Sequence, residues 1–198
     1  MTVLDFNDPA PDLDVRLALG GSVRLSTLWQ AQPLLLAFTR HFGCTQCKEM
    51  LDRLRASQAE LDAAGLRLAV VTQGTAEAAA EFCAQFAPPG SICLSDPEFK
   101  VYAAYGLERG NIFQTVLSPQ IWKAVNDAAK LKGWRLELPP AGQDAAMLSG
   151  TFVIGRDGRV RLPYYYAHIA DHPPMEALIA GFLATGWDKP LDRPIGPG

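Results

Sequence analysis

Cys44 and Cys47 lie directly after a strand-length apolar run and before an amphipathic helical pattern, and this arrangement constrains the fold more than any other feature of the chain. The run from Leu34 to Phe38 is apolar at every position, which is typical of a central strand buried on both faces. Apolar residues then recur at helical spacing from Met50 to Leu61. The pattern predicts a strand, a tight turn at Gly43 and a helix that begins at the cysteines.

Strand and helix patterns continue to alternate further along the chain. After Gly65 ends the first helix, Leu66–Thr72 has the pattern of a second strand and Thr75–Phe86 that of a capped helix. Ser91–Leu94 is a third short strand, and Thr151–Leu162 has the Asp-Gly turn of a hairpin. Such alternation predicts an α/β fold with three layers, in which helices cover both faces of a mixed central sheet.

We expect one domain over residues 1–198, because the length and a hydrophobic fraction of 48% suffice for one core. Three segments depart from the alternation of strands and helices. They are an N-terminal arm (1–19), a helical insertion (111–149) with a helix from Pro119 to Lys130, and an irregular tail (185–198) after a last helix from Met175 to Leu183.

Charge and hydropathy exclude several classes of partner. With 18 Lys and Arg against 21 Asp and Glu, the net charge of -3 gives no electrostatic reason to expect nucleic acid or an anionic membrane. No apolar run approaches the roughly 20 residues of a membrane-spanning helix. The first residues lack the basic region and apolar stretch of a secretory signal, so we expect a cytoplasmic protein.

The predicted helix start gives the two cysteines different roles. Residues three apart share one face of a helix, close enough to be closed into a disulfide. Cys44 lies at the helix N-terminus, where free backbone N–H groups and the helix dipole stabilise a thiolate. Cys47 lies inside the helix and is expected to be less exposed. We therefore predict that Cys44 is the nucleophile and that Cys47 resolves the mixed disulfide or sulfenic acid.

Arg40 and His41 are the residues expected to assist Cys44. The guanidinium of Arg40 stays protonated and presents a fork of donors to a thiolate or a peroxide oxygen. His41 precedes Cys44 by three residues, where it pairs with the thiolate, shuttles a proton near neutral pH, or is a solvated loop histidine. The predicted catalytic set is therefore Cys44, Cys47, Arg40 and His41, with no cofactor and no metal.

The other two cysteines are expected to be structural. Cys83 falls on the apolar face of a helix, and Cys93 falls inside a short apolar strand. Free cysteine is among the most buried residue types and acts there as a small hydrophobe. Four cysteines, two of them three apart, fit a reducing compartment with a functional thiol pair better than a disulfide framework.

Two alternative functions use the same residues differently. One is a metal site or metal chaperone for Zn²⁺ or Cu⁺, with Cys44, Cys47 and either His41 or His168 as ligands. The chain has no second C-x-x-C motif, which counts against this alternative. The other is an interaction module in which both cysteines are vestigial.

Three stretches of the chain resemble the AhpC/TSA-type antioxidant proteins. They are Phe38–Glu49, Leu94–Leu107 and Gly150–Gly158, and the similarity extends over roughly Gly20 to Asp171. The Arg-His-Phe-x-Cys-x-x-Cys-Lys-Glu segment is most similar to the peroxiredoxin-like 2 branch. The resemblance implies a thioredoxin fold, a redox-active C-x-x-C, a peroxide or disulfide substrate, and a thioredoxin-like or small-thiol reductant.

The chain departs from this family pattern at two places. Typical peroxiredoxins have Pro and Thr seven and three residues before the attacking Cys, where this chain has Ala37 and His41. They also have an Arg just ahead of the Thr-Phe-Val-Ile strand, where this chain reads Met147–Gly150. Peroxide reduction therefore requires that Arg40 or His41 substitute for these groups.

Aromatic residues in the C-terminal half have two interpretations each. Trp122 and Trp134 either anchor the insertion or line a lid over the cysteines. The run Tyr164–Tyr166 is typical of a packed edge or an interface. Either the insertion or this tyrosine-rich edge could support a homodimer.

Overall fold

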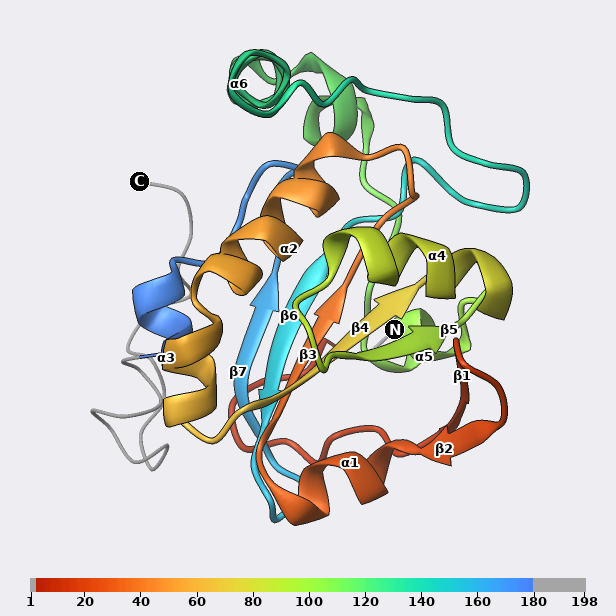
Figure 1. Ribbon diagram of the computed structural model, residues 1–198, viewed down its shortest axis with the longest axis vertical. Helices are drawn as coiled ribbons and strands as arrows, with labels where there is room; N and C mark the ends of the chain where they lie inside the picture. The colour runs from red at the N-terminus through yellow and green to blue at the C-terminus, as the bar shows by residue number, and fades with distance from the viewer. Residues whose placement is uncertain (1–2, 180–198) are drawn as a thin grey trace.

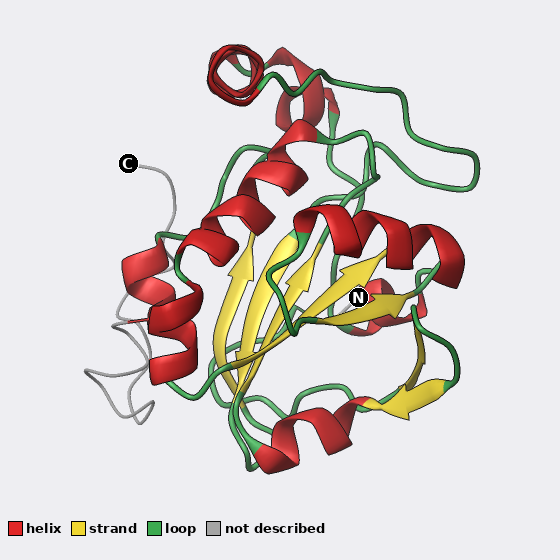
Figure 2. Cartoon of the chain, in the orientation of Figure 1, coloured by secondary structure: helices red, strands yellow, loops and turns green. Residues whose placement is uncertain are grey.

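The computed structural model describes residues 3–179, which are built around a seven-stranded mixed sheet (Figures 1 and 2). The strand order is β2-β1-β5-β4-β3-β6-β7. The strands are β1 (Asp14–Leu17), β2 (Ser22–Arg24), β3 (Leu34–Phe38), β4 (Arg67–Thr72), β5 (Ile92–Ser95), β6 (Gly150–Ile154) and β7 (Val160–Tyr165). The mixed α/β fold predicted from the alternating patterns is confirmed.

β3 can occupy an interior position in the sheet because every one of its side chains is apolar. It pairs in parallel with β4 and antiparallel with β6, and all five of its residues are buried. Successive side chains of a strand point to opposite faces. Leu35 and Ala37 therefore pack into the core on one face, and Leu36 and Phe38 into the core on the other.

Helices cover both faces of the sheet (Figure 1). One face carries α2 (Thr45–Ala56), α3 (Gln58–Ala63) and α4 (Ala76–Phe86), and the other carries α1 (Leu25–Ala31) and α5 (Lys100–Ala104). The predicted cap of α4 is present, since the Thr75 side chain accepts a hydrogen bond from the Ala78 N–H. The sheet thus lies between two helical layers, as expected.

The insertion lies across the edge of the sheet where β3 ends and α2 begins (Figure 1). It contains a π-helical turn, η1 (Phe113–Leu117), and α6 (Pro119–Lys132). The helix predicted from Pro119 is confirmed, whereas the turn before it was not expected. Lys132 forms an ion pair with Asp52 at 2.9 Å, which connects α6 to α2. The insertion is therefore held over the start of α2.

The structure differs from the expected elements at one helix and adds a strand pairing at the N-terminus. The helix expected to run from the cysteines to Gly65 is interrupted at Ser57, whose ψ of 19° ends α2 before α3 begins. The Ser57 N–H donates to the Arg53 carbonyl oxygen at 3.1 Å and so closes the last turn of α2. Within the N-terminal arm, β1 pairs antiparallel with β5 and buries Val15, a pairing that the sequence did not predict.

The C-terminal expectations lie partly outside the described residues. Residues 175–179 are helical, as predicted for the start of the last helix. The rest of that helix, to Leu183, and the irregular tail (185–198) lie outside the described residues. Within residues 3–179, no helix has both the length and the apolar character needed to cross a lipid bilayer.

Substitution of Leu35 by Ala tests the central position of β3. Leu35 is fully buried, so its removal leaves a cavity, and we expect a loss of about 2–5 kcal/mol in the free energy of unfolding. Leu131→Ala on α6 is the matched control, because Leu131 is 79% exposed and should change the value by less than about 0.5 kcal/mol. Equal effects of the two substitutions in urea denaturation would contradict this placement.

Candidate active site

The turn between β3 and α2 places Cys44 at the N-cap of α2 and Cys47 in its first turn. The turn is closed by a hydrogen bond from the Cys44 N–H to the His41 carbonyl oxygen at 3.0 Å. Both cysteines carry free thiols, and both side chains are buried. The helix therefore begins where the sequence predicted, with the two thiols in the enclosed part of the turn.

Arg40 is buried beside the two thiols. Its Nη1 donates to the Cys44 Sγ at 3.3 Å, and its backbone N–H donates to the Cys47 Sγ at 3.1 Å. The guanidinium also donates through Nε to the Met147 carbonyl oxygen at 2.9 Å and through Nη2 to the Ala145 carbonyl oxygen. Typical family members carry an arginine in the segment just before β6, where this chain has none. Here that segment instead accepts hydrogen bonds from Arg40, which belongs to the turn between β3 and α2 and places its positive charge beside Cys44.

The surroundings shift the pKa values of the two thiols in opposite directions. A hydrogen bond from Cys47 lowers the pKa of Cys44 to about 6, against the effect of burial, and the Arg40 charge acts in the same direction. Burial raises the pKa of Cys47, and the neighbouring Cys44 raises it further. At pH 7 the arrangement therefore favours a thiolate at Cys44 and a thiol at Cys47.

His41 is buried and does not supply a second positive charge. Burial lowers its pKa to about 4, and the charges of Arg40 and Lys48 act in the same direction. The imidazole is consequently neutral at pH 7. Its Nδ1 is buried without a hydrogen-bond partner among the described residues. The expectation of a solvated loop histidine is wrong, because the His41 side chain is buried.

Two glutamines that the sequence did not single out hold the segment opposite Arg40. Gln73 accepts from the Asp144 N–H at 2.6 Å and donates to the Asp144 carbonyl oxygen at 3.3 Å. The Gln143 side chain accepts from the Phe42 N–H at 2.8 Å. No sequence signal marked either glutamine, because their hydrogen bonds join residues about 70 and 100 positions apart along the chain.

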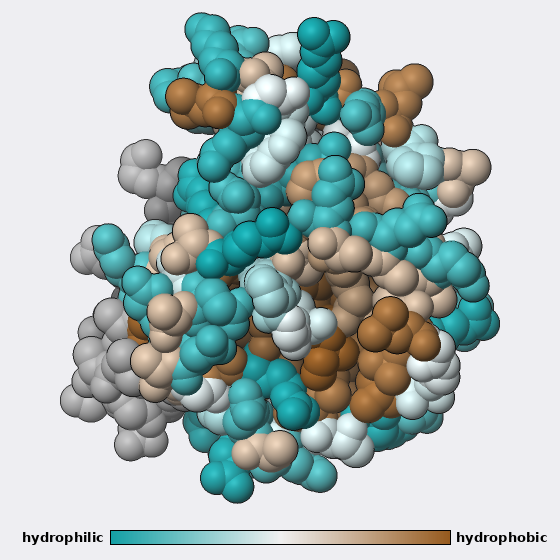
Figure 3. Space-filling model, in the orientation of Figure 1, coloured by the Kyte–Doolittle hydropathy of each residue, from teal (hydrophilic) through white to brown (hydrophobic). Residues whose placement is uncertain are grey.

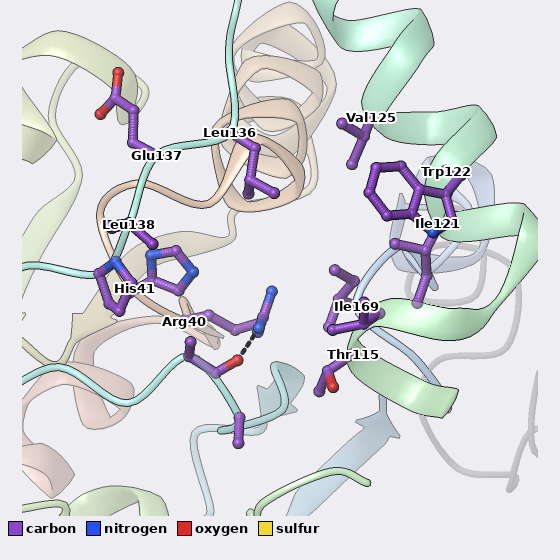
Figure 4. A pocket seen from close by; sticks show the side chains of 14 residues that line it. Arg40, His41, Thr115, Ile121, Trp122, Val125, Leu136, Glu137, Leu138 and Ile169 are labelled. Carbon is purple, nitrogen blue, oxygen red and sulfur yellow. Dashed lines mark hydrogen bonds between the residues drawn. The ribbon is translucent and has the colours of Figure 1, made fainter. Parts of the chain in front are cut away.

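A cavity of about 450 Å³ opens beside Arg40 and His41, beneath the insertion (Figure 4). Figure 4 shows Arg40 and His41 on one side and the α6 side chains on the other. Apart from Arg40, His41, Thr115 and Glu137, the lining is apolar: Val116, Ile121, Trp122, Val125, Leu136, Leu138, Pro139, Ala145, Ala146 and Ile169. Cys44, whose Sγ accepts a hydrogen bond from Arg40, does not itself line the cavity.

The insertion covers the cysteine turn directly. The Glu137 N–H donates to the Gly43 carbonyl oxygen at 3.2 Å, and a Cβ added at Gly43 would lie 2.5 Å from the Glu137 carbonyl oxygen. Trp122 lines the cavity, while Trp134 packs edge-on against Phe86. Trp122 thus faces the cavity beside Arg40 and His41, and Trp134 anchors the insertion through Phe86.

Cys83 and Cys93 differ from the expectation of separate buried hydrophobes. They form a disulfide between α4 and β5, with Cα atoms 6.4 Å apart, and both residues are only partly buried. The sequence did not reveal the pair, because the periodicity of a helix or a strand does not show which residue of one element lies beside which residue of the next. Crossover packing brings residue 83 next to residue 93.

The donor set for a metal site is not assembled in the described part of the chain. No group of three or more His, Cys, Asp or Glu side chains is arranged as metal ligands among residues 3–179. The alternative that joins Cys44 and Cys47 to His41 or His168 thus gains no support from the geometry.

A thioredoxin-like sheet with a cysteine pair at the start of the helix after its central strand defines a class of thiol proteins. The family model described as AhpC/TSA antioxidant enzyme matches residues 53–168. The chain belongs to this AhpC/TSA family, as the resemblance of its motifs predicted. The matched residues begin after Cys47, so the cysteine pair itself lies outside the match.

Curated relatives agree with this assignment. Peroxiredoxin-like 2C of Bos taurus is 25% identical over 173 residues, covering 85% of this chain and 75% of the relative. Prostamide/prostaglandin F synthase of Bos taurus is 28% identical over 177 residues, covering 88% and 86%. The expected similarity to the peroxiredoxin-like 2 branch is therefore confirmed.

Solved structures confirm the fold. Peroxidoxin BcpB of Mycobacterium tuberculosis has a TM-score of 0.59 at 21% identity, covering 92% of this chain and 96% of its own. The yeast mitochondrial 1-Cys peroxiredoxin has a TM-score of 0.66 at 12% identity, covering 98% and 85%. At such low identity the similarity establishes the thioredoxin-like fold and nothing finer.

The lowered pKa predicts how Cys44 responds to pH. Since only the thiolate reacts, its alkylation rate should fall as pH falls through about 6 and level off above that value. Arg40→Met removes the neighbouring positive charge, so the midpoint should move upward by about one unit or more. Alkylation at a series of pH values, followed by peptide mass spectrometry, measures the midpoint at Cys44 alone.

Arg135→Met is the control for that experiment, because Arg135 is exposed in the insertion and makes no contact with the thiols. It should leave the midpoint unchanged. A wild-type midpoint near the usual cysteine value would contradict the role assigned to Arg40.

Proposed function

We propose that the protein is a peroxiredoxin-like thiol oxidoreductase in which Cys44 attacks a peroxide or a disulfide and Cys47 resolves the product. The observation that carries this proposal is the buried guanidinium of Arg40, which donates to the Cys44 Sγ at 3.3 Å. A positive charge held against one sulfur stabilises its thiolate and then the developing charge on a substrate oxygen.

The peroxide reaction proceeds in two steps. The Cys44 thiolate forms an S–O bond as the O–O bond breaks, and the departing alkoxide takes a proton and leaves as an alcohol. The Cys47 thiol then gives up its proton and its sulfur attacks the sulfenic sulfur, so that an S–S bond forms, the S–O bond breaks, and the oxygen leaves with that proton as water. Cys47 is suited to this step because its raised pKa keeps it protonated until Cys44 has been oxidised.

A disulfide substrate follows the same sequence through a mixed disulfide. In both cases a thioredoxin-like or small-thiol reductant returns two electrons and regenerates the pair. Such reductants are kept available in reducing compartments, and we accordingly propose a cytoplasmic location. His41 remains neutral beside the substrate and offers a hydrogen bond in place of the missing family threonine.

We propose that the peroxide substrate carries an apolar chain. The cavity beside Arg40 and His41 is lined mainly by aliphatic side chains and Trp122, and Figure 4 shows Arg40 and His41 facing the apolar side chains of α6. An apolar chain in this cavity would leave its hydroperoxide group next to Arg40. Because Cys44 is fully buried, attack also requires the Glu137–Pro139 segment or the Arg40 side chain to move aside.

Serine substitutions separate the two cysteine roles. Cys44→Ser should abolish peroxide consumption, because no other thiol is activated by Arg40. Cys47→Ser should permit one turnover and leave a sulfenic acid on Cys44, detected by mass spectrometry after dimedone trapping. If wild-type Cys44 reacts with peroxide no faster than a free thiol at the same pH, the peroxidase proposal fails and disulfide exchange remains.

Elemental analysis with a thiol titration of the same samples separates the remaining alternatives. Bound stoichiometric metal would favour the metal site. Retention of both thiols after mild oxidant would favour the interaction module.

Trp122→Ala tests the apolar substrate. Loss of the indole from the cavity wall should raise KM for cumene hydroperoxide by on the order of tenfold, since buried apolar area is lost, while the rate with hydrogen peroxide stays unchanged. Leu131→Ala on the same helix is the control, because Leu131 points to solvent and does not line the cavity. Equal changes with both peroxides would argue against binding of an apolar chain in this cavity.

A further inference from the structure

Cys83 and Cys93 place a second pair of sulfurs at the protein surface, away from Cys44 and Cys47. They form a disulfide, and their Cα separation of 6.4 Å lies within the range of native disulfides. Both residues are partly exposed, whereas Cys44 and Cys47 are enclosed. The surface pair is therefore the one that a thiol in solution can reach without movement of the insertion.

Both cysteines line a groove of about 720 Å³ that shares no residue with the cavity at Arg40 and His41. Figure 3 shows apolar surface gathered around a hollow below α4, on the side of β5 and β1. The walls are mostly small or apolar: Leu17, Ala18, Leu19, Ala80, Ala84, Ala87, Pro88, Pro89, Gly90 and Ile92, with Ser91 and Arg55. The groove gives an attacking thiol room to approach a sulfur.

Arg55 supplies positive charge to this groove. Its Nη2 donates to the Gln85 and Ala87 carbonyl oxygens at 2.9 and 2.8 Å, which fixes the guanidinium at the C-terminal end of α4. Arg55 forms no ion pair with a carboxylate among residues 3–179. A fixed cation in the groove favours the approach of a thiolate, which is the attacking species in disulfide exchange.

The surrounding structure can accommodate both the oxidised and the reduced pair. The Cys93 Sγ lies 3.7 Å from the Ala79 carbonyl oxygen, an acceptor available to the Cys93 thiol once the disulfide opens. β5 is held by its parallel pairing with β4, independently of the sulfurs. Opening of the disulfide therefore leaves the pairing of β5 with β4 intact.

We infer that Cys83 and Cys93 form a second, solvent-accessible dithiol–disulfide couple whose substrates are small thiols and small disulfides. In reduction, a thiolate attacks one sulfur, which forms a mixed disulfide and releases the other cysteine as a thiol. A second small thiol attacks the mixed disulfide and leaves as a small disulfide, so two electrons reach the pair. A small disulfide drives the reverse reaction by the same steps.

A glutathione titration of the full chain tests the couple. The Cys44→Ser/Cys47→Ser variant removes the other pair, so every thiol change reports on Cys83 and Cys93. The variant is equilibrated without denaturant in glutathione buffers from fully reduced to fully oxidised, quenched with acid, alkylated and mapped by mass spectrometry. We expect two thiols per chain to be lost and regained reversibly, with the peptides of Cys83 and Cys93 cross-linked in the oxidised form.

Two results would overturn the inference. A pair that stays oxidised in excess reduced glutathione is a permanent cross-link, and a pair that stays reduced in oxidised glutathione is two ordinary thiols. If the variant does not fold, the same peptide mapping on wild-type protein follows Cys83 and Cys93 separately from Cys44 and Cys47.

A matched control separates this inference from the proposed function. Cys83→Ser/Cys93→Ser keeps Cys44 and Cys47, so it should keep the wild-type rate of peroxide consumption while losing the glutathione-dependent change at the groove. Failure of the couple thus leaves the peroxidase proposal intact, and failure of that proposal leaves the couple intact.

Discussion

The buried hydrogen bond between the Arg40 guanidinium and the Cys44 sulfur is the interaction on which the rest of the site depends. A guanidinium removed from water needs partners for its donors, and a thiolate removed from water needs a neighbouring positive charge. Within residues 3–179 Arg40 forms no ion pair with a carboxylate, and its side chain donates to two carbonyl oxygens and to Cys44. The Arg40 guanidinium and the Cys44 thiolate therefore each lower the free-energy cost of burying the other.

This requirement explains why several distant segments meet at the cysteine turn. The carbonyl oxygens of Ala145 and Met147 must point at Arg40, and Gln73 fixes the backbone between them and the sheet. The insertion then covers the turn through Glu137 and Gly43. Water is excluded from the thiols, which strengthens the electrostatic effect of Arg40 and leaves an apolar cavity as the adjoining space.

The two cysteine pairs occupy opposite kinds of environment within one fold. One pair lies at a helix start beneath an insertion, with its charge partner buried beside it. The other joins the C-terminal half of α4 to β5, and both cysteines line a groove together with Arg55. Burial and charge make the first pair selective for what enters the cavity, while exposure makes the second pair available to any small thiol.

Local sequence patterns predicted much of the fold, and each had a physical reason. The five apolar residues of β3 required cover on both faces, the Asp-Gly turn predicted the hairpin, and Thr75 marked the start of α4. The break at Ser57 and the pairing of β1 with β5 were not predictable in this way. A helix break or an edge pairing is decided by small energy differences that depend on which neighbour is available.

By itself, the sequence determined that two thiols lie at the start of a helix after a buried strand, because spacing along one chain segment fixes that geometry. Only the tertiary structure decided that Arg40 points at Cys44, that His41 is buried and neutral, and that Cys83 joins Cys93. Those outcomes depend on burial and on contacts between segments far apart in the chain. Hydrophobic periodicity does not reveal which distant backbone carbonyl oxygens will accept hydrogen bonds from a buried guanidinium.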